Sequence, residues 1–463
     1  MYREPQPLLD CAVFTPTDLH VDLATGEVAL GYRLSGGSSP EIDFTERVRF
    51  PVPEAEPGEQ RRAAFHAVLR LLHAVAGVSY FKAAAPPVVD LGSTRFTSAE
   101  LAYLEAVYRH GLREFAYSND LPAVLHTRFT AAAGQPLTDP DAAVADWYSI
   151  KDRPLVPCGG GKDSIVSTEA MISAGRDPIA FAVNPNHIIS GVVAASGLEL
   201  LAVRRTLDRQ LFELNRQGAY NGHVPVTAVN SLLAVATSIL HGLGPVVMSN
   251  ESSASAPNLD WHGEPVNHQW SKSAAAEQAL QAALASRLGV HDLYFSLLRH
   301  LNEMQIARLF AGTTGYDGVL TSCNNAYTID RPATLRWCGD CPKCRFVFLA
   351  LAPFTSVERL VGIFGADLLR QESQLPGYQV LLGIGGYKPF ECVGEISESQ
   401  AAVARLAELP AWRDAVVIQR LLPDLDRAAT PSWPEVLDRR GDSFAPDGFV
   451  AALDSLAGAA VSS

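Results

Sequence analysis

The stretch Pro154-Leu-Val-Pro-Cys-Gly-Gly-Gly-Lys-Asp-Ser-Ile-Val-Ser-Thr-Glu-Ala-Met171 decides the fold of this chain. Its first four residues are apolar and predict a short buried strand, and three consecutive glycines then turn the chain into a helical pattern. Glycines let a ligand approach the backbone closely, and the unpaired N–H groups at a helix start attract negative charge. The stretch therefore predicts a binding site for the phosphate chain of a nucleotide.

The residues after the glycines narrow this prediction. A Walker A loop requires Ser or Thr directly after its lysine, whereas Asp163 follows Lys162 here, so a Walker loop is excluded. The competing interpretation is a glycine turn that binds no ligand. Three glycines, a lysine and two capping-type residues, Asp163 and Ser164, stand together, and this density favours the anion site.

The loop resembles the Ser-Gly-Gly-x-Asp-Ser motif of the PP-loop (N-type) ATP pyrophosphatases, with Gly159 in place of the usual serine. The resemblance implies a loop that holds the pyrophosphate end of ATP while a substrate carboxylate becomes an adenylate. It also implies Mg²⁺, with Lys162 neutralising phosphate charge and Asp163 capping the helix or positioning the metal. The residues expected to bind this cofactor are Gly159, Gly160, Gly161, Lys162, Asp163, Ser164 and Asn184.

From about residue 150 onward, strand and helix patterns alternate, which predicts a doubly wound parallel α/β sheet. The resemblance of the loop implies that this sheet is of PP-loop type. Asn184 follows one predicted strand, and Asn250 and Glu251 follow another. Ligands on such sheets bind beyond the carboxyl ends of the strands. We therefore expect these three residues to face the same crevice as the glycine loop.

The chain divides by pattern into three predicted regions. Residues 1–116 form an N-terminal α+β domain, with a hairpin around Thr25-Gly26, a strand at 44–50, a helix at 61–75 and a helix at 98–115 capped by Ser98. Residues 117–345 form the PP-loop ATP-binding catalytic domain, which ends in a cysteine cluster and has a linker-like segment at 136–146. Residues 346–463 form a mainly helical C-terminal region that includes a helix over 356–369 and another over 397–422.

Composition limits the classes of function. The net charge of −13 over 463 residues argues against a broad surface for nucleic acid or anionic membranes. The longest apolar stretch, 229–248, contains polar residues and a Gly-Leu-Gly-Pro break, and it predicts a buried helix followed by a strand. The N-terminus lacks an apolar segment of signal-peptide length, so a cytoplasmic protein is expected.

Cysteine spacing predicts a metal site. Cys338, Cys341 and Cys344 form two overlapping Cys-x-x-Cys steps, and Cys323 precedes them as the expected fourth thiolate of a structural zinc ion. Cys392 or a histidine would be an alternative fourth ligand. A redox or iron–sulfur site is the competing interpretation.

Polar residues are dense between positions 221 and 272, where loops after strands are expected. For any single histidine there, a hydrogen-bonded structural role is the favoured interpretation, and the group is better evidence than any member. The glycine-rich segment 381–395 also contains side chains that can take part in chemistry. It could close over the nucleotide or simply connect packed helices. The residues of interest in these two segments are Asn221, His223, Glu251, His262, Asn267, His268, Trp270, Lys272, Lys388, Glu391, Cys392 and Glu395.

The loop, Asn250-Glu251, Asn267-His-Gln-Trp-Ser-Lys272, the cysteine cluster and Lys388-Pro-Phe-Glu-Cys-Val-Gly-Glu395 together resemble the MurL family of UDP-N-acetylmuramoyl-L-alanyl-L-glutamate epimerases. The resemblance covers most of the chain in length and motif order. It implies ATP-dependent conversion of the terminal L-Glu of a UDP-N-acetylmuramoyl dipeptide to D-Glu, with release of AMP and diphosphate, for peptidoglycan synthesis. It implies no nucleic-acid or membrane partner, and the oligomeric state stays open.

Inversion at a carbon centre requires acid/base groups on both faces of Cα. His223 and His268 are the first candidates for catalysis, followed by Glu251, Lys272 and Cys392, although a buried structural thiol is the favoured interpretation for any one cysteine. Exposed cations are usually only solvated, but the expected contacts of UDP phosphates are Arg331, Arg336 and Lys343.

Two other classes of function remain open. An amidating or nucleoside-modifying enzyme that resembles 7-cyano-7-deazaguanine synthase would explain the loop and the zinc, but neither the large N-terminal region nor the 388–395 segment. A non-enzymatic nucleotide-binding regulator would bind ATP without releasing AMP, and the polar cluster argues against it. A tRNA-thiolating enzyme is disfavoured by the acidic charge.

Overall fold

The computed structural model describes residues 8–131, 148, 152–327, 336–385, 389–426, 430–438 and 441–461. The predicted linker at 136–146 lies outside these residues. The chain separates into two compact units, each assembled from three segments. The first unit comprises Met1–Leu155, Leu201–Val246 and Trp261–Tyr294, and the second comprises Val156–Leu200, Val247–Asp260 and Phe295–Ser463. The division into three sequence regions stays a prediction.

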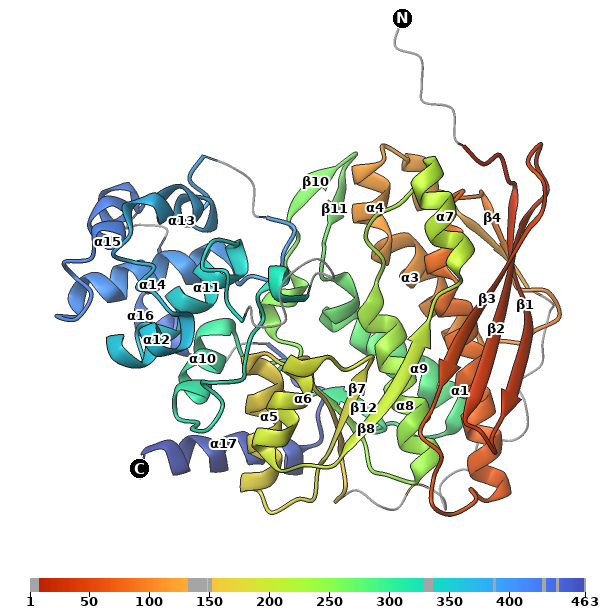
Figure 1. The fold of residues 1–463 in the computed structure, drawn as a ribbon, viewed down its shortest axis with the longest axis horizontal. Helices are drawn as coiled ribbons and strands as arrows, with labels where there is room; N and C mark the ends of the chain where they lie inside the picture. The colour runs from red at the N-terminus through yellow and green to blue at the C-terminus, as the bar shows by residue number, and fades with distance from the viewer. Residues whose placement is uncertain are drawn as a thin grey trace, which may run out of the picture. The chain divides into compact units, whose positions relative to one another are not determined.

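The first unit is built on a mixed sheet. Its strands are β1 (Val13–Asp22), β2 (Glu27–Ser35), β3 (Ile42–Arg49), β4 (Val88–Asp90), β5 (Arg128–Thr130) and β8 (Leu200–Thr206). They follow the order β8-β3-β2-β1-β4-β5, and β1, β2 and β3 lie side by side in Figure 1. The predicted hairpin is confirmed, since β1 and β2 pair antiparallel through the turn before Glu27. Strand β3 shows strict alternation of buried and exposed residues, so one face of the sheet meets the core and the other meets solvent.

Strand β8 has one pairing that the sequence does not predict. The pattern predicts a strand of the α/β sheet, and β8 follows β7 in the strand order; its antiparallel pairing with β3, with Val48 opposite Arg205, is the additional pairing. The buried Glu46 explains part of this attachment, because its carboxylate accepts two hydrogen bonds from the Arg205 guanidinium. Sequence periodicity carries no sign of this pairing, since an ion pair between distant strands leaves no local pattern.

The first unit also contains helices. They are α1 (Glu59–Ala76), α2 (Val78–Phe81), α3 (Ser98–Gly111), α4 (Arg113–Ser118), α7 (Arg209–Gln217), α8 (Val226–His241) and α9 (Ala274–Leu288), with the 3-10 helix η1 (Pro122–His126). The predicted cap of α3 was wrong by one residue, because Thr97 and Glu100 form a capping box there. The segment Glu59–Phe81 has the length and apolar composition of a membrane span, but 89% of its most apolar window is buried inside the structure. It is therefore accounted for as a core helix.

The second unit carries the glycine loop on a parallel sheet. Its strand order is β12 (Tyr294–Ser296), β9 (Val246–Met248), β6 (Leu155–Pro157) and β7 (Ile179–Val183). Helices α5 (Lys162–Ser173) and α6 (His187–Ser196) follow β6 and β7 in the chain, as predicted. The chain is thus mixed α/β, with a mostly parallel sheet that carries the loop. Whether this sheet is of PP-loop type stays a prediction.

The C-terminal region is helical, as predicted. It contains α11 (Pro342–Leu351), α12 (Val357–Phe364), α13 (Leu375–Leu381), α14 (Ile396–Glu408), α15 (Val416–Leu421), α16 (Trp433–Leu437) and α17 (Asp447–Val461), and α10 (Glu303–Ala311) precedes it in the chain (Figure 1). Two predicted helices are shorter than expected. Gly365 ends α12 in a left-handed conformation, and the predicted helix over 397–422 is divided into α14 and α15 near Pro410.

Candidate active site

The glycine loop has the geometry that the sequence predicted. Strand β6 ends at Pro157, the chain turns through the glycines, and α5 begins at Lys162 with Gly161 as its N-cap. Gly160 has φ of +85°, and a Cβ atom there would lie 2.7 Å from the Tyr327 hydroxyl. A Cβ atom at Gly159 would instead meet no heavy atom within 4 Å, so the backbone at this position is open to a ligand.

Lys162 occupies a position that the sequence does not predict. Its side chain is buried, and its ammonium group forms ion pairs with the carboxylates of Asp163 and Glu303. Burial alone would lower the pKa of Lys162, but the two carboxylates together raise it, so the lysine stays charged. In this conformation the Lys162 ammonium is engaged by two carboxylates, and the Ser164 hydroxyl donates to the Gly161 carbonyl at 3.0 Å.

A chain of contacts continues from Lys162 into the C-terminal helices. Glu303 is the first residue of α10, and its backbone N–H donates to Glu398 of α14 at 2.8 Å. The other carboxylate oxygen of Glu398 accepts from the backbone N–H of Glu395 at 2.7 Å. Burial and the neighbouring Glu303 raise the pKa of Glu398 to about 8, so it is protonated at neutral pH. The glycine loop and the start of α14 are thereby coupled through two acidic residues.

The polar residues predicted beside the loop lie in the same unit. Ser249, directly after β9, donates to Ser167 of α5 at 2.8 Å, which fixes the carboxyl end of β9 beside the loop helix. Asn250 and Glu251 are buried next to it, and the Glu251 carbonyl accepts from Arg299. Asn184 follows β7 in a left-handed conformation with φ of +48°. These positions agree with the expected placement of polar residues at the carboxyl ends of the strands.

The four predicted cysteine ligands converge in the second unit. The Sγ–Sγ distances are 3.9 Å for Cys323–Cys341, 3.7 Å for Cys338–Cys344 and 3.5 Å for Cys341–Cys344. Four thiolates at about 2.3 Å from a tetrahedral zinc ion stand about 3.8 Å apart, so the donor set fits that ion. The sulfur atoms also accept backbone N–H bonds from Asp340, Cys341 and Cys344. All four cysteines are free of disulfides.

A second constellation lies in the first unit, where His223 and His268 come together. Their ring centroids are 4.6 Å apart. Glu114 faces both rings, with Oε2 at 2.5 Å from His268 Nδ1 and at 3.5 Å from His223 Nδ1. Burial lowers the pKa of His223 to about 4, against an opposing effect of Glu114, so this imidazole is neutral at pH 7. A neutral imidazole can accept a proton from a substrate.

Helix α4 organises this constellation. It carries Glu114 in its first turn, and the preceding Arg113 donates to the Pro265 carbonyl and forms an ion pair with Glu264. Asn119, at the other end of α4, donates to the Asn221 carbonyl at 3.1 Å. The helix thus holds both segments that deliver the two histidines to one carboxylate.

The donor set of Glu114, His223 and His268 could also hold a divalent ion, since its ligand atoms lie within 4.8 Å of one another. The contact between Glu114 Oε2 and His268 Nδ1 has the length of a hydrogen bond, which requires a proton on one of the two atoms. Two ligands of one ion would instead direct their lone pairs at the metal. The geometry therefore favours a carboxylate–histidine relay.

The other candidates are distributed between the two units. Lys272 belongs to the first unit and exerts a repulsive electrostatic effect on a protonated His223. Glu251 and Cys392 belong to the second unit, where the Cys392 carbonyl accepts from Lys343. Of the cations predicted for UDP phosphates, Arg336 donates to the Asp317 carbonyl at 2.9 Å, and Arg331 lies outside the described residues, as does Lys388.

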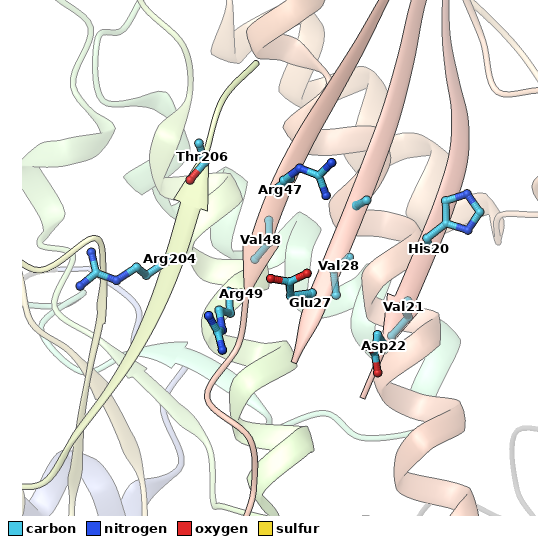
Figure 2. Close-up of a pocket in the computed structure, with 11 residues that line it drawn as sticks. His20, Val21, Asp22, Glu27, Val28, Arg47, Val48, Arg49, Arg204 and Thr206 are labelled. Carbon is cyan, nitrogen blue, oxygen red and sulfur yellow. The ribbon is translucent and has the colours of Figure 1, made fainter. Parts of the chain in front are cut away.

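A hollow of about 460 Å³ lies on the solvent face of the first unit's sheet. Figure 2 shows Arg47 and Arg49 of β3 and Arg204 of β8 on neighbouring strands around it. Arg49 is directly opposite Arg204, an arrangement of like charges that weakens strand pairing. None of the predicted catalytic or cofactor residues lines this hollow.

Comparison with known proteins settles the family. The MurL N-terminal domain model matches residues 8–297, and the MurL C-terminal domain model matches residues 319–434. Relatives from Salinispora tropica and Micromonospora sp. are each 52% identical, over 96% and 94% of both chains, respectively. A relative from Xanthomonas oryzae pv. oryzae is 44% identical over 89% of both chains. All three are named UDP-N-acetyl-alpha-D-muramoyl-L-alanyl-L-glutamate epimerase.

The chain belongs to the MurL family. It is an epimerase, and therefore an isomerase. As a member of this family it must invert a stereocentre, which makes its acid/base groups the central question.

The sequence patterns did not identify three residues that contact the predicted site residues, namely Glu114, Glu303 and Lys82. Glu114 and Glu303 are ordinary acidic residues of short helical segments, and their contacts span 154 and 141 residues, so no local pattern marks them. Lys82 left a weak signal, because it is a cation that directly follows the apolar segment Glu59–Phe81. In the folded chain its ammonium group donates to Asn221, two residues before His223.

Proposed function

We propose that this enzyme converts the terminal L-Glu of UDP-N-acetylmuramoyl-L-alanyl-L-glutamate to D-Glu, with consumption of ATP and release of AMP and diphosphate. The observation that carries the proposal is the identity of 52% over nearly the whole chain to relatives named for this epimerisation. The glycine loop supports the ATP requirement. The product would serve peptidoglycan synthesis in the cytoplasm.

Physical chemistry gives ATP a purpose in this reaction. The α-hydrogen beside a free carboxylate is very weakly acidic, because its removal would produce a dianion. Conversion of the carboxylate to an acyl adenylate removes the negative charge and lets the carbonyl accept the carbanion charge as an enolate. Proton removal on one face of Cα and return on the other inverts the centre, and hydrolysis of the adenylate then releases AMP and the product.

The residues divide between these steps by their chemistry. Gly159 to Gly161 and Ser164 would hold the pyrophosphate end of ATP, with Asp163 near Mg²⁺ and Asn184 at the end of the neighbouring strand. A thiolate set of Cys323, Cys338, Cys341 and Cys344 would hold a structural zinc ion, which stabilises the fold and leaves no open coordination position for water. The neutral His223, supported by His268 and Glu114, would exchange the Cα proton.

The test is product analysis with purified enzyme, ATP, Mg²⁺ and the UDP-linked L-Ala-L-Glu substrate. AMP and D-Glu formed in equal amounts would support the proposal. AMP without inversion would reject it in favour of an adenylating enzyme with another acceptor, such as ammonia. Bound ATP without any AMP would favour a nucleotide-binding regulator. Replacement of Ser164 by Ala, which leaves the histidines intact, should lower the rate of AMP formation.

A further inference from the structure

The two histidines are too close together to act on opposite faces of one carbon. A reacting carbon needs roughly 3–3.5 Å to the acid/base atom on each side, which separates two flanking groups by about 6–7 Å. The rings of His223 and His268 have centroids 4.6 Å apart and share one carboxylate, Glu114. They therefore act together as one acid/base group, and inversion needs another acid/base group on the opposite face of the carbon.

Lys82 lies beside this pair of histidines. It follows α2 directly, and its Nζ donates to Asn221 Oδ1 at 2.6 Å and to the Gly222 carbonyl at 3.3 Å. Both acceptors belong to the segment that leads into His223. The lysine is only 8% exposed, and both of these acceptors are neutral oxygens rather than carboxylates. A buried ammonium group with neutral partners is costly to keep, which suggests a purpose beyond packing.

The protonation states of the two groups are complementary. Burial lowers the pKa of Lys82 to about 8, and burial also lowers the pKa of His223 to about 4. At pH 7 the imidazole is neutral and the amine is charged, so one group is ready to accept a proton and the other to donate one. Efficient acid/base catalysis requires this pairing of groups whose pKa values flank the working pH.

We propose that Lys82 is the second catalytic acid/base of this epimerase and serves the face of Cα opposite to the one served by His223. The inference rests on the proposed function. In the L-to-D direction, His223 takes the Cα proton, and the electron pair of the C–H bond enters the enolate of the activated carboxyl group. The Lys82 ammonium then gives one N–H proton to the other face, and the electron pair of the enolate forms the new C–H bond. Proton exchange with solvent returns both groups to their starting states.

The test follows solvent deuterium into each epimer of the UDP-linked substrate with ATP and Mg²⁺ in D₂O. The substitution Lys82→Met should reduce inversion by about 10²–10⁴-fold. It should preserve deuterium exchange at Cα from the L-Glu epimer, through His223, and abolish exchange from the D-Glu epimer. The substitution His223→Asn should show the reverse asymmetry. A structural role for either residue would lower exchange from both epimers alike.

A second variant keeps the inference falsifiable if Lys82→Met fails to fold. Lys82→Arg retains the charge, but a guanidinium cannot release a proton near neutral pH, so the same one-sided loss is expected. Activity close to wild type in Lys82→Arg would show that Lys82 only holds an anionic group, and would overturn the proposal. The one-sided pattern in Lys272→Met instead would also overturn it.

These outcomes are distinct from a failure of the proposed function. A wild-type enzyme that inverts neither epimer would reject both proposals. Wild-type inversion, combined with unaltered or symmetric exchange in the Lys82 variants, would reject the role of Lys82 alone.

Discussion

At the scale of single residues, Glu114 is the group that gives the two histidines a common orientation. It has no expected contact with the substrate, so we treat it as a positioning residue. The substitution Glu114→Gln removes the negative charge that holds His268 and stabilises protonated His223. We expect kcat to fall by roughly 10²-fold or more while KM changes little, because the loss concerns proton transfer rather than substrate binding.

Two measurements separate positioning from a merely structural effect in Glu114 variants. Glu114→Asp should recover part of the lost kcat, because it restores the charge. The thermal unfolding midpoint of Glu114→Gln should stay near that of the wild type, since the side chain is partly exposed and lies in a polar cluster. An equal loss of kcat in both variants, or a large loss of stability, would contradict the positioning role.

Glu398 gives a prediction about pH. Its folded-state pKa of about 8 lies above the value of about 4.3 expected in an unfolded chain. The folded state therefore keeps a proton that the unfolded state loses, and its stability falls as pH rises between these values and levels off above pH 8. Glu303, Glu395 and Lys162 are the charged groups of this cluster.

The measurement is the free energy of unfolding from urea titrations between pH 5 and pH 9. Wild type should lose stability over this range more steeply than Glu398→Gln, by a few kcal/mol in total. The variant also loses one acceptor for a backbone N–H, so only the slopes with pH are compared. Parallel curves for the two proteins would show that Glu398 is ionised in the folded state.

At the scale of elements, the glycine loop offers a matched pair of substitutions. Gly160→Ala would place a side chain on a backbone with φ of +85° and against both Tyr327 and Ile188. We expect it to destabilise the protein by about 1–3 kcal/mol. Gly159→Ala meets no atom within 4 Å and should leave stability unchanged.

The same pair separates folding from ligand binding. Gly159→Ala should weaken ATP binding, because its methyl group would stand where the phosphate chain approaches the backbone. Thermal unfolding and calorimetric titration with ATP measure the two effects. If Gly159→Ala binds ATP as tightly as the wild type, the open face of Gly159 is not part of the phosphate site.

Elements also show what a sequence can and cannot reveal. The glycine loop and the cysteine cluster were predictable because each places most of its chemistry within a few consecutive residues. The hairpin and the long amphipathic helices were predictable because their periodicity is local. The antiparallel pairing of β8 with β3 was not, since it depends on Glu46 and Arg205, which are 159 residues apart. The grouping of Glu114 with His223 and His268 was hidden for the same reason.

At the scale of the whole molecule, the connectivity of the two units governs how the protein unfolds. Each unit is assembled from three separate segments, so the chain passes repeatedly from one unit to the other. Neither unit corresponds to one continuous piece of chain that could be excised. When one unit unfolds, it therefore no longer fixes the ends of the segments that form the other unit. We expect a single cooperative unfolding transition for this reason.

Removal of the proposed zinc ion from the cysteine cluster would test the expected single unfolding transition. The ligands of this ion connect residues 321–327 to the start of α11, and buried side chains of α11 belong to an apolar core of the second unit. Metal binding to a folded site stabilises it, because the unfolded chain offers no preformed site. Treatment with a strong chelator should lower the unfolding midpoint, and readdition of zinc should restore it.

Elemental analysis should find one zinc ion per chain, and Cys323→Ser should lose it, because a hydroxyl is a poor zinc ligand. Cys392→Ser serves as the control for zinc content, since Cys392 is not one of the four clustered thiols.

Two tryptophans report on the unfolding of the two units separately, Trp270 in the first and Trp412 in the second. Single-tryptophan variants should show the same lowered midpoint after chelation, because repeated crossing of the chain couples the two cores. A shift seen by Trp412 alone would mean that the second unit unfolds independently and that the crossings transmit no stability.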